Sequence, residues 1–159
     1  MPYVNCHKQG VGVEDRFIDL IGDSFIRMAT PTEDRREHWD VLCAIGKIDI
    51  KGQKRASMGD VNTNPDIHYY EFMNVAGESG WGIPTDADRV IAFESTEGFI
   101  LVSPGDIYYP LLDKCARSGG GSGFFQCRGR QGRRDWFTKV PTDFLRKYSF
   151  ETIRNDNGL

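Results

Sequence analysis

A short segment with strictly alternating residue types limits what this 159-residue chain can fold into. Residues 47–51 have the sequence Lys-Ile-Asp-Ile-Lys. Successive side chains of a β-strand point to opposite faces of a sheet. Ile48 and Ile50 are therefore expected to enter a core, while Asp49 and Lys51 are expected to share the opposite face.

The residues before this segment predict its partner strand. Residues 39–45 are short, apolar and rich in strand formers, and Gly46 suits a tight reversal because glycine accepts positive φ. Together the two segments predict a β-hairpin. With the reversal at residues 45 and 46, Asp40 would lie opposite Lys51, and cross-strand partners share a face. Asp40, Asp49 and Lys51 would then converge on one patch of sheet.

A helix is predicted over residues 13–28, where apolar residues recur at helical spacing and Asp15, Asp19 and Asp23 occupy the other side. Glu14 starts a stripe that is otherwise apolar, so its carboxylate is expected to point toward the sheet. The alternative is a glutamate that the helix dipole favours in the first turn. Pro31 is expected to end the helix, because the residue before a proline avoids the helical region.

The rest of the chain predicts a mixture of strands, loops and short helices. Strands are expected at about 67–75, 89–94 and 98–103, a mobile loop at 53–66, a late hairpin from 124–130 and 133–140, and helices at 106–117 and from 141. Pro110 should lie in the first turn of its helix or break it. The glycine-rich run at 118–123 is expected to be a loop. We therefore predict a single α/β domain over residues 1–159, with a central mixed β-sheet flanked by helices.

The composition of the chain argues against a membrane-spanning segment, a signal peptide and a zinc site. It contains no run of about 20 apolar residues that would span a bilayer, and its first residues lack the apolar centre of a signal peptide. A cytoplasmic location is the default expectation. The four cysteines are scattered and form no C-x-x-C pair, which favours reduced thiols over a zinc site.

Charge is distributed unevenly along the chain. The formal net charge is -3, yet residues 113–159 contain ten Lys/Arg against five Asp/Glu. A basic final part beside an acidic first part is typical of a protein that contacts phosphates and also binds cations. The alternative, which explains the distribution equally well, is that solvated surface charges are placed unevenly along the chain.

Two carboxylates beside one ammonium suit metal-assisted hydrolysis of a phosphodiester. Mg²⁺ prefers oxygen ligands and is usually held by one or two carboxylates, which Asp40 and Asp49 can supply. Lys51 can orient the attacking water or stabilise the transition state. The alternative is an exposed sheet face with a simple Asp–Lys pair.

A glutamate in the first helix, an aspartate on one strand and Asp49-Ile50-Lys51 on the next resemble the PD-(D/E)xK nuclease superfamily, which has a restriction-endonuclease-like fold. The resemblance covers about residues 13–55. It implies that Asp40, Asp49 and Lys51 are catalytic, that Glu14 supports them, and that Asp40, Asp49 and Glu14 hold Mg²⁺ or Mn²⁺. Trp39 stands where the motif has proline. Segments further along the chain are similar to small phage-type members of the superfamily.

Basic residues around this motif are candidates for DNA contact, because phosphate contacts supply most sequence-independent affinity. The candidates are Lys8, Lys54, Arg55, Arg128, Arg130, Arg133 and Arg134. Glu71 and His7 are weaker candidates for the site itself. Trp136 and Phe137, beside the late hairpin, are expected in the core rather than against bases.

The sequence therefore predicts an Mg²⁺-dependent or Mn²⁺-dependent DNA endonuclease, which could act on branched DNA like a junction resolvase and in a phage-infected cell. A homodimer is implied by resemblance alone. Two alternatives stay open: a non-catalytic phage factor that binds nucleic acid or protein on the same scaffold, and a phosphoesterase that acts on RNA or nucleotides.

Overall fold

The computed structural model describes residues 2–55, 57, 59–85, 88–118 and 123–155, and for residues 2–11 it describes the backbone alone. The chain divides into two compact units. Unit 1 comprises Met1–Gln53, Ala87–Val102 and Ser149–Leu159, and unit 2 comprises Lys54–Asp86 and Ser103–Tyr148. None of the helices in the described part of the chain combines the length and the hydropathy that crossing a membrane requires.

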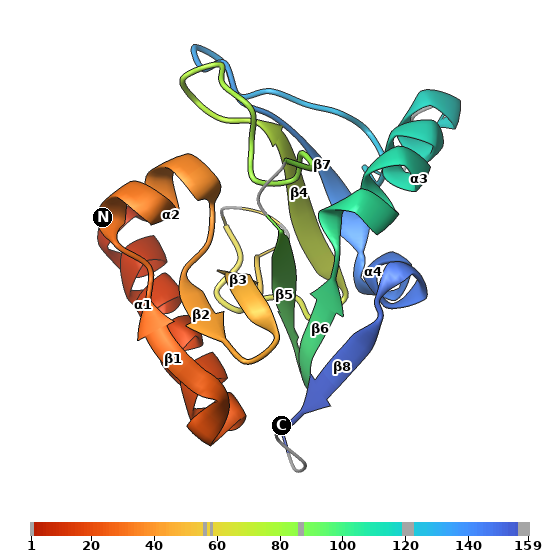
Figure 1. The fold of residues 1–159 in the computed structure, drawn as a ribbon. Coiled ribbons are helices and arrows are strands. Elements are labelled where there is room, and N and C mark those ends of the chain that lie inside the picture. Colours follow the sequence, from red (N-terminus) through yellow and green to blue (C-terminus); the bar gives the residue numbers. More distant parts are fainter. Residues whose placement is uncertain (1, 56, 58, 86–87, 119–122, 156–159) are drawn as a thin grey trace. The chain divides into compact units, whose positions relative to one another are not determined.

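Unit 1 is built around a six-stranded mixed sheet with the strand order β1-β2-β3-β5-β6-β8 (Figure 1). β3 and β5 are parallel, and all other neighbouring strands are antiparallel. The predicted α/β class with a central mixed sheet is confirmed. The elements of this unit are α1 (Pro2–Ile21), the 3₁₀ turn η1 (Gly22–Ser24), β1 (Phe25–Met28), α2 (Pro31–Glu37), β2 (Val41–Cys43), β3 (Gly46–Lys51), β5 (Arg89–Ser95), β6 (Gly98–Val102) and β8 (Glu151–Arg154).

One face of this sheet packs against α1. The helix contributes Val13, Phe17 and Ile21 to the core, at the spacing that the sequence predicts. The ring of Phe17 meets that of Phe99 edge to face, with centroids 5.1 Å apart. Strands β2, β3, β5, β6 and β8 supply the other buried members, Val41, Cys43, Ile48, Ile50, Ala92, Leu101 and Ile153. Because these side chains occupy one face, the charged residues that alternate with them on β3 lie on the other.

The predicted helix over residues 13–28 is wrong at both ends. α1 begins at Pro2, so His7 and Lys8 lie within it rather than before it. It ends at Ile21, because Gly22 adopts a φ of 53°, which glycine accepts readily and which stops helical hydrogen bonding. The segment Phe25–Met28 is instead the edge strand β1, paired with β2.

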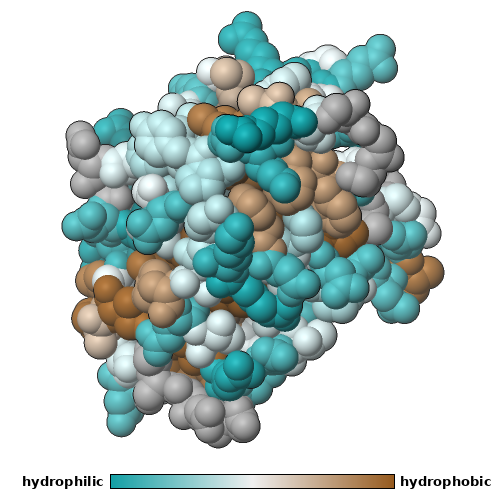
Figure 2. Space-filling view, turned by 90° about the vertical axis from the view of Figure 1, so that its right-hand side faces the viewer, coloured by the Kyte–Doolittle hydropathy of each residue, from teal (hydrophilic) through white to brown (hydrophobic). Residues whose placement is uncertain are grey.

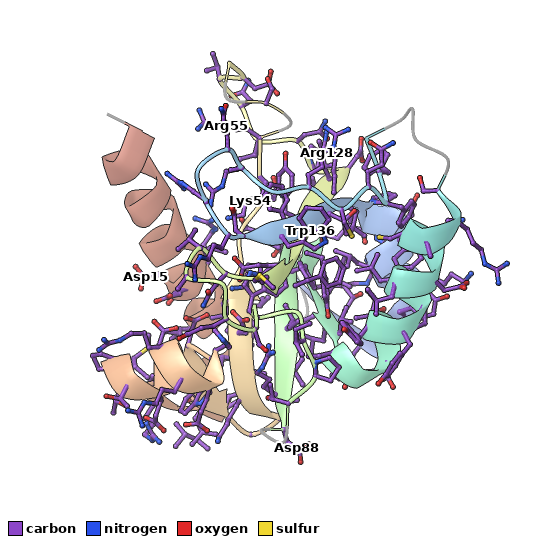
Figure 3. The ribbon with its side chains drawn as sticks, turned by 90° about the horizontal axis from the view of Figure 1, so that it is seen from above. Asp15, Lys54, Arg55, Asp88, Arg128 and Trp136 are labelled. Carbon is purple, nitrogen blue, oxygen red and sulfur yellow. The ribbon has the colours of Figure 1, made fainter. Side chains whose placement is uncertain are left out.

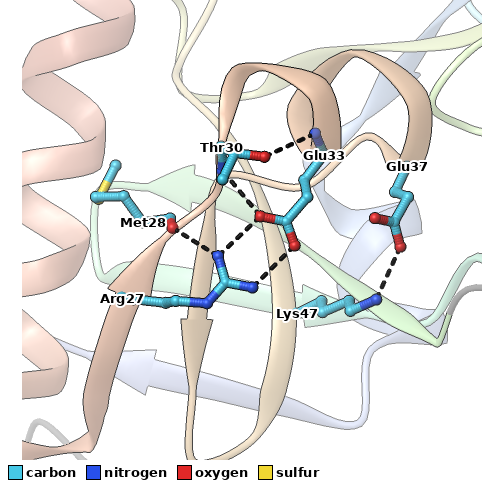
Figure 4. A network of polar contacts seen from close by, with 6 residues as sticks. All are labelled: Arg27, Met28, Thr30, Glu33, Glu37 and Lys47. Atoms are coloured by element: carbon cyan, nitrogen blue, oxygen red, sulfur yellow. Dashed lines mark hydrogen bonds and ion pairs between the residues drawn. The ribbon is translucent and has the colours of Figure 1, made fainter.

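The charged segment after β1 folds into a helix, α2, that was not predicted. Thr30 caps α2: its hydroxyl accepts the Glu33 N–H, while the Glu33 carboxylate accepts the Thr30 N–H (Figure 4). This reciprocal arrangement satisfies two backbone donors at the helix start, and Pro31 fits the first turn. Glu33 also binds Arg27 of β1 through two 2.8 Å contacts, and Lys47 of β3 binds Glu37 at 2.8 Å. These contacts hold α2 against the hairpin that carries Asp40.

Unit 2 contains a two-stranded antiparallel sheet and two helices. Its elements are β4 (Ile67–Met73), α3 (Pro104–Arg117), β7 (Trp136–Pro141) and α4 (Thr142–Tyr148). Tyr70 of β4 is fully buried and donates its hydroxyl to the Gly82 carbonyl at 2.7 Å. Phe72 of β4 meets Tyr108 of α3 with ring centroids 6.2 Å apart. The core of this unit therefore lies between the small sheet and its helices.

Several predicted elements match the structure and others need correction. The strands at 67–75, 89–94 and 98–103 and the helix after 141 are confirmed, with small changes at their ends. Pro110 lies inside α3, beyond the first turn, and the helix continues to Arg117. In the predicted late hairpin, residues 124–130 contribute only isolated bridges, Phe124 to Lys139 and Arg128 to Phe137, because β7 pairs with β4. β8 was not predicted. Most of the glycine-rich run at 118–123 lies outside the described residues.

Large apolar side chains are exposed at several separate places. The face drawn in Figure 2 carries mostly hydrophilic side chains, and the hydrophobic ones form separate patches. In the described residues, the large exposed apolar side chains are Ile26, Met28, Val61, Met73, Val75, Tyr109, Trp136 and Phe150. The core placement predicted for Trp136 is therefore wrong, whereas Phe137 packs edge to face against Tyr69, with centroids 5.7 Å apart.

Candidate functional site

The β2–β3 hairpin brings Asp40 and Asp49 onto one face of the sheet. Val41 pairs with Ile48, and the Asp40 N–H donates to the Ile48 carbonyl at 2.8 Å. The next pair outward is therefore Asp40 with Asp49, whose side chains point away from the face that packs on α1.

The predicted register, which set Asp40 opposite Lys51, is wrong by two residues. The reversal occupies Ala44 and Ile45, followed by Gly46 with a φ of 132°. A shift of two residues leaves every side chain on its predicted face, because strand side chains alternate with a period of two. The convergence of Asp40, Asp49 and Lys51 therefore survives the error in the register.

Asp40 is mostly buried, and its carboxylate is tied to the strand opposite. Its Oδ2 accepts the Ile50 N–H at 2.7 Å. Burial, together with the nearby charges of Asp49 and Glu14, raises the pKa of Asp40 to about 7, although the Ile50 N–H and Lys51 oppose the rise. Asp40 thus lies within electrostatic reach of all three of the other predicted catalytic side chains.

Asp49 is buried between two cations. Its residue is 2% exposed, and its Oδ1 lies 2.8 Å from Lys51 Nζ. Its Oδ2 lies 3.6 Å from Nη1 of Arg89, whose side chain is 1% exposed. Both cations come from strands of the same sheet, since Lys51 ends β3 and Arg89 begins the parallel strand β5.

Arg89 is a site residue that the sequence analysis missed. Lys47 pairs with Arg89, and Asp49 pairs with Ile91, so Arg89 and Asp49 lie on the same face one step apart. A charged residue directly before the apolar run of residues 90–93 was a visible signal. Its meaning depended on the pairing of β3 with β5, which are separated by a long stretch of chain.

Glu14 belongs to the same electrostatic cluster. The neighbouring residue Val13 lies against the end of β3, where a Cβ built on Gly52 would be 3.4 Å from Val13 Cγ1. This contact brings the middle of α1 to the end of the strand that carries Lys51. The charge of Glu14 is the smallest of the causes that act on the pKa of Asp40, and it raises that pKa.

The cluster fits a divalent cation held by two carboxylates. Asp49 Oδ2 is buried and accepts no hydrogen bond in the described residues, and the mutual repulsion of Asp40 and Asp49 would be relieved by a cation. Across the described part of the chain, no three His, Cys, Asp or Glu side chains come together as a metal site, so Glu14 does not complete a three-carboxylate ligand set in this conformation. Mg²⁺ usually needs only one or two carboxylates, with water and substrate phosphate as its other ligands.

The predicted DNA-contacting residues lie mainly outside unit 1. Lys54 and Arg55 begin unit 2, directly after the strand that carries Asp49. The other basic candidates of unit 2 are exposed, and they are Arg128, Arg130, Arg133 and Arg134. The side chains of His7 and Lys8 lie outside the described residues. Glu71 belongs to unit 2, where its carboxylate accepts the Trp81 N–H at 3.3 Å.

We predict that Asp40→Asn stabilises the protein at pH 8 but not at pH 4. In the folded chain the pKa of Asp40 is about 7, against 3.8 ordinarily, so the folded state holds this proton more tightly and loses stability as pH rises from about 4 to 7. At about 1.4 kcal/mol per pKa unit, the gain at pH 8 is on the order of 4 kcal/mol. Urea unfolding in EDTA measures it, and Asp19→Asn on the exposed side of α1 is the control. An equal effect of Asp40→Asn at both pH values would contradict the raised pKa.

We also predict that Arg89→Met destabilises the fold by about 3 kcal/mol, because it leaves a buried carboxylate without its buried cation. Asp49→Asn in the same chain should recover part of this stability. A double-mutant cycle measured by urea unfolding should give a coupling free energy above about 1 kcal/mol. Additive effects of the two substitutions would show that Arg89 does not act through Asp49.

Comparisons of the chain with protein-family models, with curated proteins and with solved structures found no match.

Proposed function

We propose that this chain is a metal-dependent nuclease of the PD-(D/E)xK type that hydrolyses phosphodiester bonds in DNA. The observation that carries the proposal is the shared face of Asp40, Asp49 and Lys51, two mutually repelling carboxylates beside an ammonium. This combination of charges on a sheet face suits a divalent ion and a phosphate together. Glu14 on α1 adds a third negative charge nearby.

In this proposal Asp40 and Asp49 hold one Mg²⁺ or Mn²⁺ ion. When bound, such an ion polarises the scissile phosphate and lowers the pKa of a coordinated water. The Ile50 N–H fixes Asp40 Oδ2 at 2.7 Å, so this carboxylate is positioned by the backbone of β3. Arg89 is a positioning residue, because its buried guanidinium faces Asp49 Oδ2.

Lys51 supplies the positive charge that the chemistry requires. Its Nζ is held 2.8 Å from Asp49 Oδ1, and its side chain is about one quarter exposed, so substrate can reach it. From this position the ammonium can donate to a non-bridging oxygen of the phosphate, where negative charge builds up in the transition state. It can also orient the attacking water, since a lysine has three donors on a flexible stem.

The test is cleavage of a substrate panel with Mg²⁺ or Mn²⁺ and with EDTA. We expect the chain to cut DNA only with the divalent ion, and Asp49→Asn and Lys51→Met to slow cleavage by about 10²–10³-fold. The panel contains plasmid, single-stranded DNA, a four-way junction and RNA. Asp19→Asn is the matched control, and circular dichroism verifies that each variant is folded.

Two outcomes would contradict the proposal. If no DNA in the panel is cut, the chain is not a deoxyribonuclease, and cleavage of RNA alone would favour the phosphoesterase alternative. If the two site variants cut as fast as the Asp19→Asn control, the chemistry resides elsewhere in the chain.

A further inference from the structure

Unit 2 exposes a tryptophan at the end of its small sheet. Trp136 opens β7 and pairs with Met73, the last residue of β4. Trp136 is 46% exposed and Met73 is 39% exposed. A large aromatic ring left half in water is unusual for a side chain with this much apolar surface to bury.

The chain supports this ring from one side. A Cβ built on Gly129 would lie 3.4 Å from Cε3 and 3.7 Å from Cζ3 of Trp136, and 2.8 Å from the Asp135 carbonyl oxygen. An added Cβ would clash with the Asp135 carbonyl but would make only ordinary contacts with the indole, so residue 129 lies against both the strand backbone and the ring. The ring is therefore braced against backbone while much of its surface stays open.

The same segment is strongly basic. Between residues 128 and 136 there are four arginines, all exposed, and one carboxylate, Asp135, which is buried and binds Arg130 at 2.6 Å. In the described part of the chain, Arg130 is the one arginine of the four that forms an ion pair. The others are Arg128, Arg133 and Arg134. Arg128 donates to Gln126 Oε1 at 2.5 Å, a neutral acceptor, so no carboxylate in the described residues neutralises the charge of these three guanidinium groups.

Backbone contacts fix where these arginines are presented. The Arg128 N–H donates to the Phe137 carbonyl at 2.8 Å, and the Phe137 N–H donates back at 2.9 Å, directly beside Trp136. Figure 3 labels Arg128 and Trp136 on this part of unit 2. The Arg133 N–H closes a turn on the Arg130 carbonyl at 3.0 Å. The stem of Arg134 passes over Gly77, where a Cβ would be 2.9 Å from Arg134 Cδ.

We infer that Trp136, together with Arg128, Arg133 and Arg134, forms a binding surface for a DNA strand with unpaired bases. An exposed aromatic ring stacks on the face of a base, and only an unpaired base at a strand end, gap or loop offers that face. The positive charges of the arginines are complementary to the negative phosphates on either side of the base. This inference rests on the proposed nuclease function, which is the reason for taking DNA as the ligand. The substrate class is then single-stranded or branched DNA.

The test measures binding in EDTA, so that cleavage plays no part. Fluorescence anisotropy compares a labelled single-stranded oligonucleotide with a duplex of the same sequence. We expect Trp136→Ala to weaken binding of the single strand by about 5- to 100-fold and binding of the duplex by less than about twofold. Trp136→Phe, which keeps an aromatic face, should retain most of the wild-type affinity. Tyr109→Ala, at a 70% exposed aromatic residue of α3 in the same unit, is the matched control and should change neither affinity.

The arginines are tested by salt dependence. Arg133→Gln with Arg134→Gln should weaken binding of both DNA forms. With the single strand, the slope of log K against log salt should become shallower by about 0.7 for each phosphate that the variant no longer neutralises. The inference is overturned if Trp136→Ala leaves single-strand binding unchanged, or weakens single strand and duplex equally. If the chain binds DNA as expected but does not cleave it, the proposed nuclease function is wrong and the binding surface is supported. If the chain cleaves DNA but Trp136→Ala has no effect on binding, the nuclease function is supported and the binding surface is wrong.

Discussion

The alternation of β3 is the constraint on which the candidate site depends. Ile48 and Ile50 are buried in the core beneath α1, so Asp49 and Lys51 must lie on the opposite face of the sheet. The adjacent strands then place Asp40 and Arg89 beside Asp49. Any change that moves the register of β3 by one residue would exchange the isoleucines with the charges, and the core would be disrupted together with the site.

Burial strengthens the electrostatic interactions among the charged side chains of this site. A charged group leaves water at a large free-energy cost, and the fold retains two carboxylates and two cations in one small region. The pairing is unequal: Asp49 has Lys51 and Arg89, whereas Asp40 has a backbone N–H and a raised pKa of about 7. The unneutralised charge at Asp40 is what a bound cation would compensate, which links the stability of the fold to the proposed chemistry.

The sequence predicted the central part of this fold because its signals are local. The parity of residues 47–51 placed the site residues on one face even though the register of the hairpin was wrong, since an error of two residues preserves the face. The signals that were misjudged were also local: the positive φ of Gly22 and the capping box at Thr30 mark helix ends that the apolar pattern obscured. Arg89 and the exposure of Trp136 could not be predicted, because both depend on pairing between strands that are far apart in the sequence.

The most direct test of the central claim, that Asp40 and Asp49 form a cation site, is calorimetric titration of Mn²⁺ into the chain without DNA. We predict that one ion binds per chain, and that binding is strongly weakened in Asp49→Asn and in Asp40→Asn and unchanged in Asp19→Asn. A cation site at Asp40 and Asp49 is contradicted if the folded wild-type protein binds no Mn²⁺, or if all three variants bind Mn²⁺ as well as the wild type does.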